Sequence, residues 1–577
     1  MPNFFTDNED ILDFLDNADL RTMVMLQERG YAEAKEYDYA PADYEDAMDN
    51  YRRVLEVIGK VAAEFIAPRA AEVDREGAHF DDGKVTYARG TREALDQLRK
   101  AELMGFTLPR RFGGLNMPVL IYTIAIELVS QADASLMNLF GLQDIAETIN
   151  SFADEEIRAR YLPRFSSGEV TAAMALTEPD AGSDLPNVQL RADYDEATGQ
   201  WRLNGVKRFI TNGCGDILLV LSRSEPDSEG ARGLSVYVCE AGPAVRVRRI
   251  EDKLGIHGSP TCELQFNNAP ALLVGQRKRG LSTYVGALMN GARLAIAAQG
   301  VGIAQAALNE ALDYAAEREQ FGKAIREFPA VRQMLGDMHM KVETARLLTY
   351  DTAVAVDIAD GIEHMKASGE LDALPNGSQL AAEGRYWTTL ARALTPVAKY
   401  YATETCNQVA YDALQVLAGS GYMRDYEVER HYRDARITTI YEGTTQIQYN
   451  AAVGYVLKGT FEERYGVLHE QMTAAGAPED LLLPLQEARR ALQEAVDYAA
   501  AQDADYRDLH AGKLVEAATI IYNGYLLLGP ALRSKHKEAL ARHYVAETLP
   551  IVRLRRDQML SGSRVYLDRM ADLLQYE

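Results

Sequence analysis

A change in hydrophobic periodicity, followed by its reversal, limits what this chain can fold into more than any other feature of the sequence. Before about residue 165 apolar side chains recur at helical spacing, as in the segment 51–71. Between about residues 169 and 266 short β-branched runs alternate with turn residues, and after Gly275 the helical spacing returns. This order predicts a mainly α-helical protein with a compact β domain inserted between helical blocks.

Long amphipathic helices are expected in the block that follows the β domain. Apolar residues three and four apart predict helices at 301–315 and 331–345. Gly369 and Gly377 interrupt this pattern, which predicts a loop-like insertion at 364–379. The expected strands are 188–194, 201–206, 217–221, 234–239 and 245–250. The expected domains are an N-terminal helical domain with a leading extension (1–168), a middle β domain (169–273), a helical bundle (274–457) and an additional helical domain (458–577).

Charge and composition exclude several classes of function. The 61 Lys and Arg residues against 85 Asp and Glu give a net charge of −24, which in general repels nucleic acid and anionic lipid unless a basic patch is concentrated somewhere. No apolar run reaches the roughly 18–20 residues that span a bilayer, and the acidic N-terminus lacks the pattern of a secretory signal. The 9 histidines show no HExxH spacing, so no metal site is expected. The 4 cysteines form no CxxC pair, which predicts a reduced, cytoplasmic protein.

A polar loop at the entrance to the β domain is the first candidate site. No GxGxxG fingerprint of a pyridine-nucleotide site is present. The loop instead covers residues 176–184 and reads LTEPDAGSD. Its hydroxyls and free backbone N–H groups suit an anion or the carbonyl edge of a flavin. Composition alone also allows an ordinary turn.

Three further motifs join this loop and make the chain recognisable. The loop 176–184 resembles the first signature of the acyl-CoA dehydrogenase family, and 415–422 (QVLAGSGY) resembles the second. Between them, 317–323 (EREQFGK) resembles the flavin-binding stretch of that family. After them, 440–448 (IYEGTTQIQ) resembles the segment that holds its catalytic base.

The resemblance covers about residues 50–457 and implies a fold. The implied parts are an N-terminal helical domain, a middle β-barrel or sandwich and a C-terminal four-helix bundle. The remainder resembles the helical C-terminal extension of the longer members, where the extension covers the surface that shorter members use to form tetramers. A homodimer is therefore implied. Asn187, Phe209 and Ala418 depart from the family pattern, but none of them touches the base.

The reaction implied by the resemblance is the α,β-desaturation of an acyl-CoA thioester. Glu442 is the implied base for the α proton, and burial is expected to raise its pKa. Its backbone N–H would hold the thioester carbonyl, and FAD would take the β hydride before passing electrons to an electron transfer flavoprotein. Some members place the base one position before a motif arginine, but here that position is Ala292, before Arg293. The role of base therefore falls to Glu442, with Arg293 beside it.

The family motifs also imply contacts with the cofactor and the substrate. The implied contacts to FAD in the same subunit are Leu176, Thr177, Ser183, Phe209 and Thr211, with Thr444 and Gln446 on the adenosine side. Residues implied to reach the FAD of a neighbouring subunit are Arg318, Gln320, Phe321, Gln415 and Gly419. The implied substrate contacts are Ser183, Asn290, Arg293, Tyr441 and Gly443.

Two alternatives and one local feature stay open. An acyl-CoA oxidase shares the fold and the base but lets O₂ reach the reduced flavin. A flavin-containing relative that binds DNA would need a basic face, and the densest basic run is 275–280 (GQRKRG). This run either attracts the CoA phosphates or an acidic face of the electron acceptor, or is a solvated turn. The helix at 135–142 is expected to line the acyl pocket, but the acyl group itself is not readable.

Overall fold

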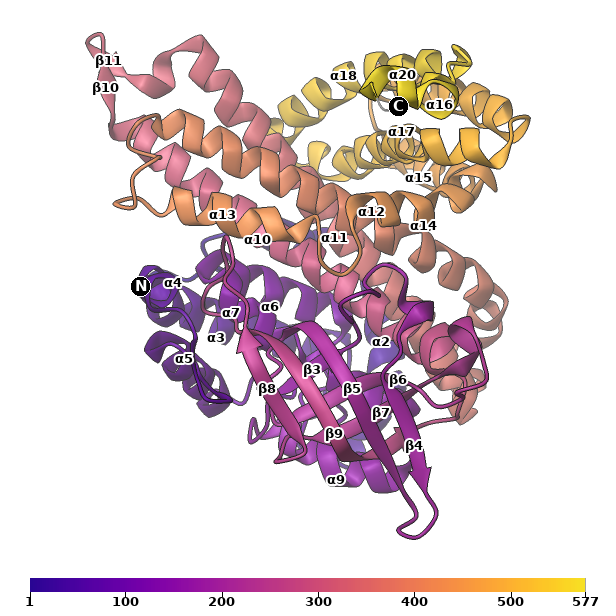
Figure 1. The fold of residues 1–577 in the computed structure, drawn as a ribbon. Helices are drawn as coiled ribbons and strands as arrows, with labels where there is room; N and C mark the ends of the chain where they lie inside the picture. The colour runs from indigo at the N-terminus through magenta and orange to yellow at the C-terminus, as the bar shows by residue number, and fades with distance from the viewer. Residues whose placement is uncertain (576–577) are drawn as a thin grey trace.

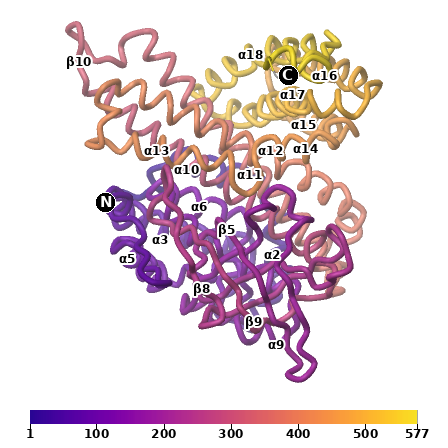
Figure 2. Tube along the Cα trace, viewed as in Figure 1, coloured from indigo at the N-terminus to yellow at the C-terminus, as the bar shows by residue number. Residues whose placement is uncertain are grey.

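The computed structural model describes residues 1–575 and arranges them in three layers (Figures 1 and 2). The N-terminal helices and the β domain lie together on one side of the molecule. Long helices from the middle of the chain cross above them, and the C-terminal helices pack on the far side of these (Figure 1). The predicted fold class, mainly helical with an inserted β domain, is confirmed.

The N-terminal block is helical and surrounds one very apolar helix, α6. Asn8 and Asp43 cap helices α1 and α3 by accepting hydrogen bonds from free N–H groups of the first turn. All residues of α6 after the first are buried, in accord with its continuous apolar sequence. The elements are α1 Glu9–Asn17, α2 Arg21–Gln27, α3 Tyr44–Val61, α4 Ala67–Glu76, β1 His79–Asp81, β2 Lys84–Thr86, α5 Arg89–Lys100, α6 Val119–Ala132, α7 Ala134–Phe140, α8 Gln143–Phe152 and α9 Glu155–Ser166.

The β domain is a seven-stranded sheet that closes on itself. Strand β6 pairs with β3, β4 and β7, while β9 pairs with β5, β7 and β8. The strands are β3 Ala172–Ala175, β4 Arg191–Asp195, β5 Gln200–Thr211, β6 Ile217–Arg223, β7 Leu234–Glu240, β8 Val245–Ile250 and β9 Thr261–Val274. The periodicity did not predict β3, which is very short, or β9, which the turn-like sequence Asn267-Asn268-Ala269-Pro270 interrupts.

Long helices form the layer above the sheet. They are α10 Gly286–Glu317, α11 Pro329–Ser368, α12 Gly377–Leu417, α13 Val428–Thr438 and α14 Thr445–Leu457, with a hairpin of β10 Glu319–Gln320 and β11 Lys323–Ala324 between α10 and α11. The predicted loop at 364–379 is wrong at both ends. Helix α11 continues to Ser368, where Gly369 ends it in a left-handed conformation (φ 76°). A short 3₁₀ turn at Leu371–Ala373 follows, and α12 begins at Gly377.

The C-terminal helices pack on α11, α12 and α14. Their elements are α15 Thr460–Ala474, α16 Glu479–Ala500, α17 Ala504–Ala531, α18 Lys535–Leu560, α19 Val565–Asp568 and α20 Met570–Leu574. The Tyr522 hydroxyl of α17 donates to Asp351 Oδ2 of α11 at 2.5 Å, and Arg464 pairs with the same carboxylate at 3.3 Å. The first helix also reaches this region, since Arg533 pairs with Asp13 at 2.8 Å. In residues 1–575, no helix combines the length and the apolarity that crossing a bilayer requires.

Candidate functional site

The loop between α13 and α14 presents Glu442 in an unusual backbone conformation. Glu442 has φ 55° and Gly443 has φ 90°, so both lie in the left-handed region, which disfavours a glutamate. Two donors hold the turn in this shape. The Gln448 amide donates to the carbonyls of Glu442 (3.1 Å) and Gly443 (2.9 Å), and the Lys399 ammonium donates to the Gly443 carbonyl (2.8 Å).

Tyr441 ties the same loop to the helices on its other side. Its hydroxyl donates to Asn138 Oδ1 of α7 at 3.1 Å and contacts the amide oxygen of Gln299 on α10. The Gln299 amide donates in turn to the Ala134 carbonyl at 3.0 Å. Burial raises the pKa of Tyr441, so its proton stays in place as a donor. The loop that carries Glu442 is thus fixed by three helices, α7, α10 and α12.

Electrostatics at Glu442 fit a base. Burial raises the pKa of Glu442, and the charges of Lys399 and Arg293 offset part of that rise. Burial lowers the pKa of Arg293, and Glu442 opposes this. Arg293 Nη1 donates to Asn290 Oδ1 at 3.3 Å, while its Nε is buried without a partner among the described residues. The structure therefore brings together Glu442, Arg293 and Asn290, as well as Tyr441 and Gly443, which adjoin Glu442 in the chain.

A second carboxyl group, which the sequence reading missed, lies close to this cluster. Asp144 of α8 has no hydrogen-bond or ion-pair partner for its carboxylate among residues 1–575. A Cβ at Gly291, between Asn290 and Arg293, would stand 3.4 Å from Asp144 Oδ2. Burial, followed by the charges of Glu147 and Glu442, raises the pKa of Asp144 to about 8. The available signal was an acidic residue just beyond the helix expected to line the acyl pocket.

The loop at 176–184 and the end of β5 form a second cluster at the edge of the β domain. The Arg208 N–H donates to the Thr177 carbonyl at 2.9 Å, and buried Lys207 donates to the Leu176 carbonyl at 2.7 Å. Phe209 follows, with φ 60°, at an irregularity in the β5–β9 ladder, and its side chain is 52% exposed. Thr211, at the end of β5, is half-buried.

The same edge offers backbone donors. The N–H groups of Gly182 and Ser183 find no acceptor within the described part of the chain, and both residues are exposed. Free N–H groups beside an exposed aromatic ring suit the polar and planar parts of a flavin. The edge therefore fits FAD in residue type and in unsatisfied donors.

Another set of predicted residues lies apart from both clusters. Arg318, Gln320 and Phe321 belong to the β10–β11 hairpin at the far end of α10 from the β domain (Figure 1), and Phe321 is 94% exposed. Gln415 and Gly419 are also exposed, at the end of α12. Tyr314 next to the hairpin donates to Ser420 Oγ at 3.2 Å, which places both segments side by side. Within one subunit, these five residues do not join the β-domain edge.

The remaining predicted contacts follow Glu442 along the chain. Thr444 is the residue before α14 and is half-buried, and Gln446 is exposed in its first turn. The basic run 275–280 is partly neutralised, because Glu225 pairs with Arg277 at 2.7 Å and with Lys278 at 3.8 Å. Arg277 also lies over the Trp201 ring.

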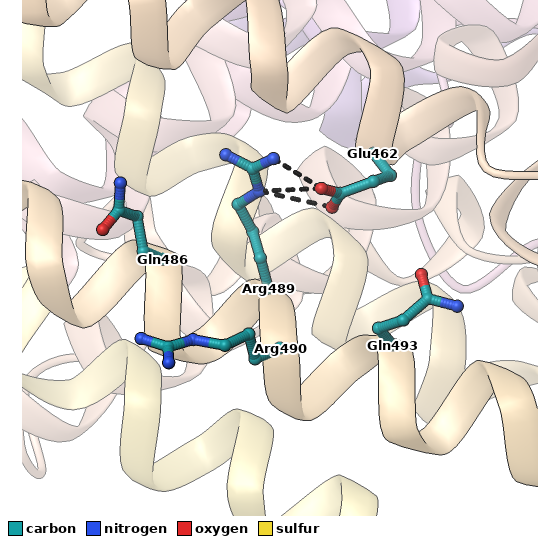
Figure 3. Close-up of a pocket in the computed structure, with 5 residues that line it drawn as sticks. All are labelled: Glu462, Gln486, Arg489, Arg490 and Gln493. Atoms are coloured by element: carbon teal, nitrogen blue, oxygen red, sulfur yellow. Dashed lines mark hydrogen bonds and ion pairs between the residues drawn. The ribbon is translucent and has the colours of Figure 1, made fainter.

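A surface hollow in the C-terminal helices is separate from the site. It is lined by Glu462, Gln486, Arg489, Arg490 and Gln493 (Figure 3). Arg489 donates to the Glu462 carboxylate, so the charge of the Arg489 guanidinium is largely matched (Figure 3). None of its residues belongs to either cluster described above. Among residues 1–575, no three His, Cys, Asp or Glu side chains are grouped to hold a metal ion.

The protein is mainly helical, with an inserted β domain and a carboxylate-bearing loop between α13 and α14. Three family models match in chain order: the acyl-CoA dehydrogenase N-terminal domain at residues 48–169, the middle domain at 173–269 and the C-terminal domain at 278–453. The chain belongs to the acyl-CoA dehydrogenase family, a class of FAD-dependent oxidoreductases.

Individual relatives agree with this assignment. An acyl-CoA dehydrogenase of Bacillus subtilis is 36% identical over 375 residues, which cover 64% of this chain and 90% of the relative. The butyryl-CoA dehydrogenase structure from Megasphaera elsdenii is 30% identical, with a TM-score of 0.60 over 71% of this chain and 98% of that one. An acyl-CoA dehydrogenase from Bacillus anthracis complexed with FAD shares the fold over 91% of both chains, with a TM-score of 0.74 and 23% identity.

Proposed function

We propose that this protein desaturates an acyl-CoA thioester to the 2-enoyl-CoA, with Glu442 as the base that removes the α proton. The observation that carries the proposal is the state of Glu442. Its carboxylate has a pKa raised by burial, forms no ion pair among the described residues and faces the charges of Lys399 and Arg293. A carboxylate of raised pKa is the stronger base that a weakly acidic thioester α carbon requires.

The backbone at the same residue supports a second role. The Glu442 N–H donates to no acceptor in residues 1–575. A free N–H next to the base can bind the thioester carbonyl oxygen and stabilise the negative charge that develops there. Arg293 and Asn290 stand beside it on α10 and orient the substrate in this account.

FAD is the cofactor implied by family membership, and its bound form supplies the acceptor for the β hydride. We assign its flavin end to the cluster at the β-domain edge, where the Phe209 ring is exposed and Gly182 and Ser183 offer free N–H groups. Leu176, Thr177 and Thr211 complete this edge, and Thr444 and Gln446 are assigned to the adenosine side.

We propose that the protein acts as a homodimer, on the basis of the residues that lie apart. Arg318, Gln320, Phe321, Gln415 and Gly419 form an exposed group distant from the β-domain edge of their own subunit (Figure 1). An exposed Arg can bind a pyrophosphate through paired hydrogen bonds, so this group is proposed to act on the FAD of a second subunit.

We further propose an electron transfer flavoprotein as acceptor and, because the four cysteines are unpaired, a cytoplasmic location.

Anaerobic titration tests the function. The purified protein is mixed with a panel of straight, branched, cyclic and aromatic acyl-CoAs, and the visible flavin spectrum is followed. At least one acyl-CoA is expected to bleach the flavin, with the matching enoyl-CoA as product. A colourless protein that cannot be reconstituted with FAD contradicts the proposal. Rapid acyl-CoA-dependent peroxide formation in air, without another acceptor, would instead identify an oxidase.

A further inference from the structure

Lys399 of α12 is a fully buried lysine without a carboxylate in contact. It is 0% exposed, and no ion pair involves it in the described part of the chain. Its one hydrogen bond goes to the Gly443 carbonyl, at 2.8 Å. Buried lysines are rare unless a partner compensates for their lost hydration. The role of Lys399 must therefore be sought in the loop that it contacts.

That loop needs support. Glu442 and Gly443 occupy consecutive left-handed positions, and a non-glycine residue is held there only when its surroundings impose the conformation. The Gly443 carbonyl accepts from two buried side chains, Lys399 and Gln448. Lys399 adds a positive charge to the hydrogen bond, and charge-assisted hydrogen bonds are the stronger kind.

We propose that Lys399 is a positioning residue for Glu442: it holds the Glu442–Gly443 turn through the Gly443 carbonyl and opposes the negative charge of the Glu442 carboxylate. This inference rests on the proposed role of Glu442 as the base. Lys399 acts through the loop, because its hydrogen bond goes to the loop backbone.

The charges around Lys399 agree with this role. Burial lowers the pKa of Lys399 to about 8, and Glu442, ahead of Glu404, opposes that lowering. At Glu442 the pKa moves in the opposite direction, because burial raises it. The positive charge of Lys399 counteracts this rise more than that of Arg293 does. The Glu404 carboxylate is engaged elsewhere, since the Thr445 hydroxyl donates to it at 2.5 Å. Glu442 is thus the principal opposite charge for Lys399.

Two substitutions separate the charge from the hydrogen bond. Lys399→Met removes both, and Lys399→Gln removes the charge but keeps a donor. Gln448→Met is the matched control, because it removes the other donor to the Gly443 carbonyl without changing any charge. Flavin content and thermal stability are measured for each holoenzyme before kcat/KM is determined across pH.

The expected result is a shift of the acid limb of the pH profile. Without the positive charge the pKa of Glu442 rises, and the base is ionised only at higher pH. Both Lys399 variants should therefore move the acid limb upward by about one pH unit, and Lys399→Met should also lower kcat at its optimum. Gln448→Met should lower kcat without moving the limb.

The outcomes distinguish this inference from the function on which it rests. An acid limb that stays in place in both flavin-loaded Lys399 variants overturns the positioning role. If Lys399→Met loses its fold, Lys399→Gln, which keeps an amide donor on a shorter polar side chain, carries the test. Should Glu442→Gln retain full α-proton removal, the proposed base is wrong, whatever the Lys399 variants do.

Discussion

This molecule contains two buried clusters of charged residues, which differ in whether their charges form direct ion pairs. Where α1, α6, α11 and α18 meet, each buried charge has direct partners. Arg346 pairs with Glu127 at 2.8 Å and with Asp10 at 3.1 Å, and Lys537 pairs with Glu343 at 2.8 Å. At the loop between α13 and α14, Glu442 has no ion pair among the described residues, and its nearest cations act without contact.

The difference appears in the pKa values. Burial disfavours the charged form of Arg346, but Glu127 and Asp10 outweigh it and raise the Arg346 pKa, which locks the charge in place. Burial instead prevails at Glu442, raising its pKa, and at Lys399, lowering its pKa to about 8. The matched cluster holds its charges in fixed pairs, whereas the unmatched one keeps a carboxylate of raised pKa, as the proposed base requires.

The largest effect is expected when the matched cluster is broken. Arg346→Met leaves Glu127 and Asp10 without their shared cation, and removing one partner of a buried pair costs about 3–5 kcal/mol. Thermal unfolding should show a clear drop in Tm, while the acid limb of the remaining activity stays in place. The matched control is Arg553→Met, which breaks an exposed pair with Glu487 and should change stability by less than about 1 kcal/mol. Equal Tm values for the two variants would contradict the contrast between the clusters.

The unmatched cluster predicts a pH dependence of catalysis. The pKa of Glu442 is raised above its ordinary value of 4.5, and only the ionised carboxylate can accept the α proton. Below the raised pKa, kcat/KM should therefore fall about tenfold per pH unit. The profile is measured over the range in which the flavin spectrum shows an intact holoenzyme. Constant kcat/KM down to pH 4.5 would show that burial does not govern this carboxylate.

A smaller effect is expected at Asp144, the second unpaired carboxyl group. The pKa of Asp144 is raised to about 8, so its side chain is mostly neutral near pH 7. Replacing it with leucine removes a polar group from the neighbourhood of Arg293. Asp144→Leu should raise kcat/KM for straight apolar acyl-CoAs about five- to tenfold relative to acyl-CoAs with a polar group, which corresponds to roughly 1 kcal/mol of discrimination. Glu156→Leu, at an exposed position of α9, is the control. Unchanged selectivity in Asp144→Leu would show that Asp144 does not contact the acyl group.

Periodicity and motif resemblance predicted different parts of this molecule. The three-block order and five strands could be read from the sequence because each depends on neighbouring residues. The motif IYEGTTQIQ located the Glu442 loop, although the role of each site residue is still a prediction. Lys399, Asp144 and the pairing of Asp10 with Arg346 could not be read, because the residues that surround each of them are far away in the chain. The break after α11 was overestimated, because glycine and proline marked a turn but not how far the helices continue on either side.

The most direct test of the account measures how fast the substrate α proton exchanges with deuterium from D₂O. An acyl-CoA is bound to the holoenzyme under anaerobic conditions, and its deuterium uptake is measured by mass spectrometry. Wild-type protein and the Arg553→Met control should exchange this proton. Glu442→Gln should retain its flavin and its Tm but lose about 10²–10⁴-fold in exchange rate. Exchange at the wild-type rate in flavin-loaded Glu442→Gln would contradict the claim that this buried, unpaired carboxylate is the base.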